Sequence, residues 1–129
     1  MTLDRRLFTK LLAAFGVSTA APALAQSKTV EVTMRQQPKM IFVPQNLTVS
    51  VGDTVRWTNP FSIPHTVTFD PSMGASAGNV VLPAGVEPFD SGDIEESGTF
   101  MHTFTVAGEY KYICKYHESL GMVATLTVK

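Results

Sequence analysis

The chain has 129 residues, a net charge of −1, three histidines and a single cysteine. This length suits one domain, and the near-neutral balance without a basic run argues against nucleic acid as a partner. The lone cysteine excludes a small domain held by intramolecular disulfides, because such a framework needs cysteines in pairs.

Residues 1–25 have the three parts of a secretory signal. The start carries basic residues, the next stretch is apolar, and its end, Ala23-Leu24-Ala25, fits an A-x-A cleavage site. The apolar stretch is shorter than the about 20 residues that a membrane-spanning helix needs. We therefore expect cleavage after Ala25 and a mature domain of residues 26–129, in preference to an uncleaved anchor or an N-terminal helix of the fold.

The export signal also resembles the twin-arginine box, in which an Arg-Arg pair is followed by x-Phe-x-Lys. Here Arg5-Arg6 is followed by Leu7-Phe8-Thr9-Lys10. The twin-arginine route exports proteins that have already folded, so we expect the mature protein to work in a bacterial periplasm, without stable insertion in the membrane.

Charge is unevenly distributed in the mature chain, which keeps seven Lys and Arg and ten Asp and Glu for a net charge of −3. No Lys or Arg occurs between Arg56 and Lys111, whereas five acidic residues fall within residues 87–96. Such a cluster is usually a solvated loop, but it can also steer a basic partner toward the protein.

Period-two alternation of apolar and polar residues, broken by turn residues, predicts short strands throughout the mature chain. In chain order these are residues 47–51, 54–58, 65–69, 99–105, 109–114 and 122–128. Short alternating strands with frequent turns are typical of an antiparallel β-sandwich or barrel. The mature chain has no helical stripe and no internal repeat.

Residues 70–98 form the one long irregular segment, rich in Gly, Pro, Ser and acidic residues. A connection of this length usually hides a short element or a functional loop. We expect short edge strands at residues 80–82 and 88–91, and a crossing from one sheet to the other.

The residues able to carry chemistry gather near the C-terminus in the spacing Cys-x2-His-x4-Met. Cys114 ends one predicted strand, His117 lies in the following loop, and Met122 begins the last strand. Strand parity places both sulfur side chains on the buried faces of their strands. His65 opens the predicted strand 65–69 on its apolar parity, so it too can point inward.

A thiolate, two imidazoles and a thioether favour copper. Soft sulfur suits copper(I), imidazole accepts either oxidation state, and two His and one Cys with a long axial Met define the blue-copper electron-transfer site. Zinc would also bind such a set, although structural zinc sites more often recruit further Cys or His than Met. We therefore predict one copper ion, held by His65, Cys114, His117 and Met122.

Each of these residues also has an ordinary structural interpretation. Cys114 alone is consistent with a buried core thiol or an intermolecular bridge, and Met122 alone with a core methionine. The offsets between Cys114, His117 and Met122 favour the ligand interpretation. For His102, the third histidine, we expect a core or edge position, and for Trp57 a core position.

Three runs resemble plastocyanins and their bacterial relatives, the blue copper proteins of the cupredoxin family. Residues 110–122 are similar to their copper loop, residues 47–57 to the strand and turn before the first ligand, and Pro64-His65 to the first-ligand site. Pseudoazurins share the loop spacing, and amicyanins have a shorter loop. The resemblance spans about residues 40–129.

The resemblance implies an all-β Greek-key sandwich or barrel of about eight strands. It makes His65, Cys114 and His117 the strong copper ligands and Met122 the weak axial one. His117 would be the solvent-edge ligand through which the electron passes, within an apolar surface that includes Pro64, Leu120 and Gly121.

Two departures from the plastocyanin pattern affect these expectations. Plastocyanins have Asn after the first His, bonding toward the Cys sulfur, whereas this chain has Thr66, whose hydroxyl would have to take that role. Plant plastocyanins have Tyr before the Cys, in the patch that meets their cytochrome, whereas this chain has Ile113. Ile113 argues against a photosynthetic partner.

These observations predict a monomeric periplasmic carrier that shuttles one electron between redox proteins, such as a c-type cytochrome or a periplasmic oxidoreductase. We do not expect an enzyme. Multicopper oxidases need a His-Cys-His run, where this chain has Ile113 and Lys115 beside the cysteine, and a binuclear copper centre needs two cysteines. The alternatives are a copper carrier or buffer without an electron partner, and a metal-free binding module.

Overall fold

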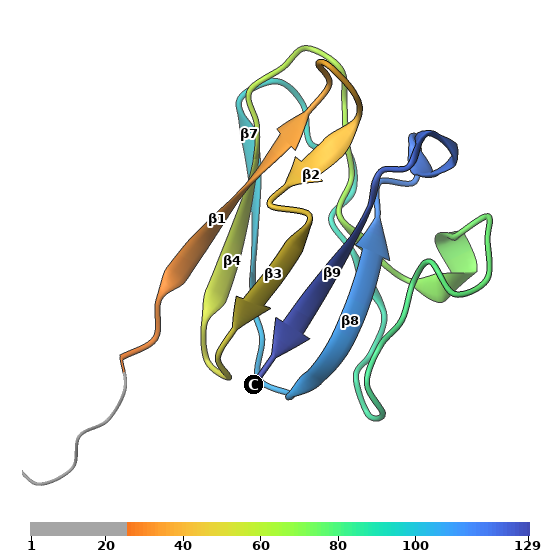
Figure 1. The fold of residues 1–129 in the computed structure, drawn as a ribbon. Coiled ribbons are helices and arrows are strands. Elements are labelled where there is room, and N and C mark those ends of the chain that lie inside the picture. Colours follow the sequence, from red (N-terminus) through yellow and green to blue (C-terminus); the bar gives the residue numbers. More distant parts are fainter. Residues whose placement is uncertain (1–25) are drawn as a thin grey trace, which may run out of the picture.

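Two β-sheets packed face to face form the part of the chain that this computed structural model describes, residues 26–129 (Figure 1). The first sheet has the order β2 (Ile41–Val43), β1 (Thr29–Arg35), β4 (Thr54–Asn59) and β7 (Gly98–Thr103). The second has the order β3 (Asn46–Val49), β9 (Val123–Val128), β8 (Gly108–Ile113), β5 (Thr68–Phe69) and β6 (Phe89–Asp90). Two short 3-10 turns are added, η1 (Pro71–Met73) and η2 (Glu118–Leu120). The predicted all-β sandwich is confirmed, with nine strands in place of about eight.

Both sheets are mixed, since each contains one parallel pairing among antiparallel ones. β1 pairs with β4 in parallel, with Thr29 opposite Thr54, and β3 pairs with β9 in parallel, with Asn46 opposite Thr125. The other pairings between strands are antiparallel. Alternation along one strand reports its two faces but carries no information on the direction of its neighbour.

The first two strands were missed in the sequence, although β1 carries a usable signal. Val30, Val32 and Met34 alternate with polar residues, and in the structure Val32 and Met34 are fully buried. Phe42 of β2 is fully buried as well. These side chains join the core between the sheets.

The irregular segment holds the two edge elements expected in it. β6 lies within residues 88–91, and Val81 forms an isolated bridge with Lys111 of β8. His65 differs from the expectation, because it lies before the short strand β5 and makes only an isolated bridge with Ile94. Thr66 and Thr68 are fully buried together with their apolar neighbours, so alternation of burial does not hold here.

Aromatic side chains fill the centre of the sandwich. Phe69 stacks on Tyr112 and on Phe89 with ring centroids 4.6 Å apart in both pairs. Trp57 is fully buried, as predicted, and its indole N–H donates to the Tyr112 hydroxyl over 3.1 Å. Such pairs contribute packing energy beyond the area that they bury.

His102 has the structural place expected of it. Its ring is half-buried and stacks on Phe89, with centroids 3.9 Å apart and an angle of 13° between the planes. Burial lowers the pKa of His102.

Asp53 closes the turn between β3 and β4. Its carboxylate accepts the backbone N–H of Lys28 over 2.9 Å and that of Ser50 over 2.9 Å, and these bonds hold the pKa of Asp53 below its usual value. Because the charged form is the one stabilised, the contribution to folding is complete above the unfolded pKa of about 3.9 and is lost as the pH falls through the lower folded pKa.

We therefore expect Asp53→Asn to lower the free energy of unfolding at pH 7 and to have a smaller effect near pH 3. Denaturant unfolding of both proteins across this range measures the difference. A difference that stays constant with pH would show that the charge of Asp53 contributes nothing.

Candidate metal centre

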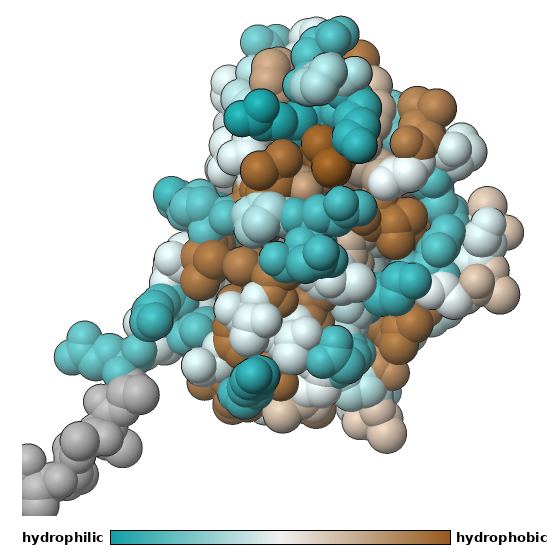
Figure 2. Space-filling model, viewed as in Figure 1, coloured by the Kyte–Doolittle hydropathy of each residue, from teal (hydrophilic) through white to brown (hydrophobic). Residues whose placement is uncertain are grey.

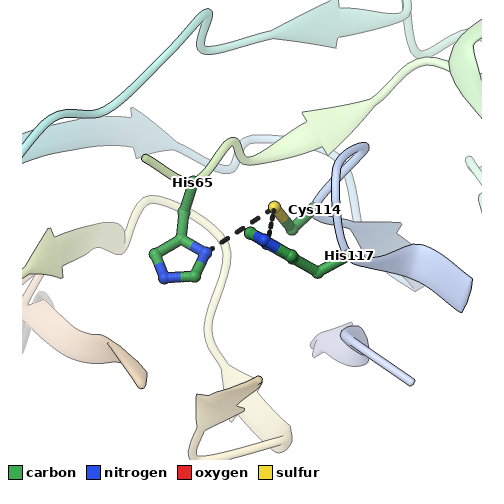
Figure 3. Close-up of side chains that lie close together, drawn as sticks. All are labelled: His65, Cys114 and His117. Atoms are coloured by element: carbon green, nitrogen blue, oxygen red, sulfur yellow. Dashed lines mark hydrogen bonds between the residues drawn. The ribbon is translucent and has the colours of Figure 1, made fainter. Parts of the chain in front are cut away.

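Three side chains of ligand type meet at one end of the sandwich (Figure 3). His65 comes from the segment before β5, Cys114 directly follows β8, and His117 immediately precedes η2. Their potential ligand atoms all lie within 4.8 Å of one another. His65 and Cys114 are fully buried, whereas His117 is partly exposed, so the group has one side open toward the surface.

Both imidazole rings turn the same nitrogen toward the sulfur (Figure 3). The distance from Cys114 Sγ to Nδ1 is 3.3 Å for His117 and 3.8 Å for His65. The Nε2 atom of His65 is buried without a hydrogen-bond partner. A proton placed on that Nε2 leaves the Nδ1 lone pair free toward the sulfur.

The surroundings keep both imidazoles neutral near pH 7. Burial, with a smaller contribution from the nearby His117, lowers the pKa of His65 to about 4. Burial also lowers the pKa of His117. A neutral imidazole is the form that binds metals, so neither histidine has to lose a proton before it can bind a cation at pH 7.

Backbone hydrogen bonds close the loop that runs from Cys114 to Met122. The N–H of His117 donates to the carbonyl of Cys114, the N–H of Met122 donates to the carbonyl of His117, and the N–H of Cys114 donates to the carbonyl of Met122, each over 3.1 Å. Gly121 allows the return of the chain with a φ of 91°, a conformation that favours glycine. The loop thereby brings Met122, fully buried, back beside Cys114.

Thr66 contributes to the site in a different way from the one expected. Its backbone N–H, not its hydroxyl, donates to Cys114 Sγ over 3.3 Å. Its hydroxyl oxygen accepts the backbone N–H of Lys115 over 2.9 Å. The Thr66 hydroxyl therefore supports the loop through the peptide of Lys115, whereas the bond to the sulfur comes from the Thr66 backbone.

Sequence reasoning missed Glu118, which anchors the loop on its other side. Its buried carboxylate accepts the backbone N–H of Ala75 over 2.7 Å, that of Ser76 over 3.1 Å and the side-chain N–H of Asn79 over 3.0 Å. The bond from Ala75 contributes most to lowering the pKa of Glu118. The only signal in the sequence was an acidic residue directly after the loop histidine.

The open side of the site is bordered by apolar residues. A shallow hollow beside His117 is lined by Ile63, Pro64, Asp93 and Tyr116, and Leu120 nearby in the chain is 63% exposed. Brown, apolar atoms lie over the loop between β8 and β9 on the face shown in Figure 2. The partly exposed histidine thus lies beside an apolar part of the surface.

Fold and donor set together are those of a plastocyanin-like cupredoxin. The family model for copper binding proteins of the plastocyanin/azurin family matches residues 28–129. The chain therefore belongs to this copper-binding family. The match begins at β1, earlier than the resemblance seen in the sequence.

Relatives and solved structures agree with this family. The plastocyanin of Nostoc punctiforme is 32% identical over 123 residues, covering 92% of this chain and 85% of the relative. The chloroplastic plastocyanin of Chlamydomonas reinhardtii is 31% identical over 121 residues, covering 88% and 78%. The copper(I) form of an amicyanin variant matches with a TM-score of 0.60 and 28% identity, covering 83% of this chain and 87% of that one. A pseudoazurin from Methylobacterium extorquens AM1, 22% identical with a TM-score of 0.59, shares the fold.

Within residues 26–129, no helix has the length and apolar character needed to cross a membrane. The predicted export signal, residues 1–25, lies outside the described residues.

Proposed function

We propose that the protein is a periplasmic blue-copper carrier that moves one electron at a time between redox proteins, and is not an enzyme. The copper ion is held by His65, Cys114, His117 and Met122. The observation that carries the proposal is the buried Cys114 sulfur with an imidazole Nδ1 at 3.3 Å and another at 3.8 Å.

The donor set fits copper in its chemistry. Two neutral imidazoles and one thiolate, with a buried methionine beside the cysteine, combine the nitrogen and soft sulfur donors that both copper oxidation states accept. No carboxylate belongs to this group of donors within residues 26–129, so hard cations such as Mg²⁺ are disfavoured. The bound copper would supply the one-electron change between Cu(I) and Cu(II).

The protein's contribution is to hold these donors still while charge changes. The loop from Cys114 to Met122 is fixed by its own backbone bonds, by Thr66 on one side and by Glu118 on the other. Because the donors are held in place, they rearrange little when the oxidation state changes. The barrier to electron transfer therefore stays low.

The exposed edge of His117 gives a partner a short route to the site. The apolar surface of Ile63, Pro64, Tyr116 and Leu120 would pack against a redox protein such as a c-type cytochrome. Within the acidic stretch, Glu87, Glu95 and Glu96 are exposed and form no salt bridge in the described chain, so their charges remain available to steer a basic partner.

The test of the copper site uses the chain of residues 26–129 loaded with copper(II). We expect an intense blue absorption and a narrow copper hyperfine splitting in the electron paramagnetic resonance spectrum, both lost on reduction. A pale solution with an ordinary copper spectrum would mean that the thiolate is not a ligand.

A measurement of electron transfer distinguishes an electron carrier from a protein that only carries or buffers copper. Mixing the copper(II) protein with a reduced c-type cytochrome should oxidise the cytochrome rapidly, at a rate that falls as salt rises if the acidic residues steer the partner. Glu95→Gln/Glu96→Gln should weaken this salt dependence and leave the blue spectrum unchanged. Readily exchanged copper without electron transfer would instead indicate a copper carrier or buffer.

Export is part of the same proposal and has its own test. Expression of the full chain in a bacterium with a twin-arginine system should yield a periplasmic protein beginning at Gln26. Replacement of Arg5-Arg6 by Lys-Lys should retain the protein in the cytoplasm. Export of both forms alike would point to another route.

A further inference from the structure

A line of hydrogen bonds leads from the candidate metal loop through the second sheet to a carboxylate on its edge strand. The backbone N–H of Lys115 lies 2.9 Å from the Thr66 hydroxyl oxygen, which lies 2.9 Å from the Thr68 hydroxyl oxygen. The Thr68 hydroxyl donates to Asp90 Oδ1 over 2.5 Å. Both threonines are fully buried, so water does not compete for the bond between their hydroxyls.

The sheet register explains how the line passes from one strand to the next. Thr68 of β5 lies opposite Asp90 of β6 on one side and opposite Ile113 of β8 on the other. Ile113 directly precedes Cys114, so the same rung of the sheet reaches the candidate ligand. The three strands hold the groups in place independently of any metal.

The chemistry of the groups fixes the direction of every bond in the line. A carboxylate only accepts, and a hydroxyl has a single proton to donate. The Thr68 proton therefore goes to Asp90, the Thr66 proton goes to Thr68, and a lone pair of Thr66 remains for the Lys115 N–H. The second oxygen of Asp90 accepts the N–H of Gly92 over 3.0 Å, which holds the carboxylate at both ends.

The bond to Thr68 matters for Thr66 because it fixes the direction of the Thr66 hydroxyl, the one polar group of that side chain. Its backbone N–H donates to Cys114 Sγ while its hydroxyl accepts from Lys115, so two crossing bonds join Thr66 to the metal loop. A hydroxyl that is free to rotate could direct its proton at the Lys115 N–H and break the second bond. The acceptor at Thr68, itself oriented by Asp90, removes that option.

We propose that Asp90 is a positioning residue for the metal loop, acting through the hydroxyls of Thr68 and Thr66 to hold the Lys115 amide and with it the Cys114 sulfur. The consequence for the metal rests on the proposed copper function, whereas the hydrogen-bond line itself does not. The competing view is that the two hydroxyls merely satisfy each other inside the sheet.

Thr68→Val and Thr68→Ser form a matched pair for the test, since Val keeps the shape of Thr without the hydroxyl and Ser keeps the hydroxyl. Hydrogen exchange of the Lys115 amide is measured in ¹⁵N-labelled protein, with global stability measured alongside. We expect exchange roughly three- to tenfold faster in Thr68→Val than in Thr68→Ser, the range for loss of one hydrogen bond. The Trp57 amide in the first sheet serves as the internal reference and should exchange equally in both variants.

The copper-loaded variants test the consequence for the sulfur. The reduction potential and the wavelength of the blue absorption band should shift in Thr68→Val and stay at the wild-type values in Thr68→Ser. A purely structural role would change stability without moving either quantity. Equal Lys115 exchange in the two variants, or equal potentials, would overturn the proposal.

Asp90→Ala provides the second test if Thr68→Val does not fold, because Asp90 is only partly buried. It should speed Lys115 exchange in the same way, and unchanged exchange would overturn the proposal. Failure of the proposed function would look different: wild-type protein would show no blue band, while the exchange result would still decide whether Asp90 positions the loop.

Discussion

Cys114→Ser is expected to abolish the blue absorption of the copper-loaded protein completely. The intense colour of such sites arises from the bond between thiolate and copper, and a serine hydroxyl neither ionises near neutral pH nor offers soft sulfur. Visible absorption and electron paramagnetic resonance spectra of the variant with added copper(II) measure the effect. Any copper that still binds should give a pale, ordinary spectrum.

A matched pair of histidine variants controls for nonspecific damage. His117→Gln removes a candidate ligand and should lose the blue band, whereas His102→Gln alters a histidine that stacks on Phe89 away from the site and should keep it. Unfolding curves establish that each variant is folded. A Cys114→Ser protein that remained blue would contradict the ligand assignment altogether.

Phe69→Ala is expected to lower the free energy of unfolding by about 3–5 kcal/mol, the range for deleting a buried phenylalanine side chain. The Phe69 ring is fully buried and stacks on both Tyr112 and Phe89, and it also contacts Trp57 and Phe104 edge-on or at a tilt. Because a domain of this kind is stable by only about 5–15 kcal/mol in total, the variant should be close to unfolding. Chemical denaturation of the metal-free protein measures the loss.

Phe100→Ala is the control for this prediction, since it removes the same atoms from a partly buried position on β7. Its loss should be clearly smaller. Equal losses in the two variants would show that neither the deeper burial of Phe69 nor its stacking adds to stability.

The chain by itself determined the strands with clear alternation and the identity of the candidate donors. Parity correctly placed Cys114 and Met122 on buried faces, because side chains along a strand point alternately to its two sides. The spacing from Cys114 to Met122 is local, so the ligand loop was visible without any knowledge of the rest of the fold.

Tertiary structure decided which distant segments meet. His65 lies 49 residues before Cys114, and only the neighbouring positions of β5 and β8 in one sheet bring its Nδ1 to 3.8 Å from the sulfur. The parallel pairing of β1 with β4 and of β3 with β9 was equally out of reach, since alternation does not encode the partner of a strand.

The hydrogen bonds that hold the metal loop also form only in the folded chain. Glu118 finds its donors 39 to 43 residues away, and Thr68 meets Asp90 at a distance of 22 residues along the chain. A buried polar side chain must find a partner, but the sequence does not say which one. Donor types are properties of single residues, whereas their geometry and hydrogen bonds arise only when the two sheets close around them.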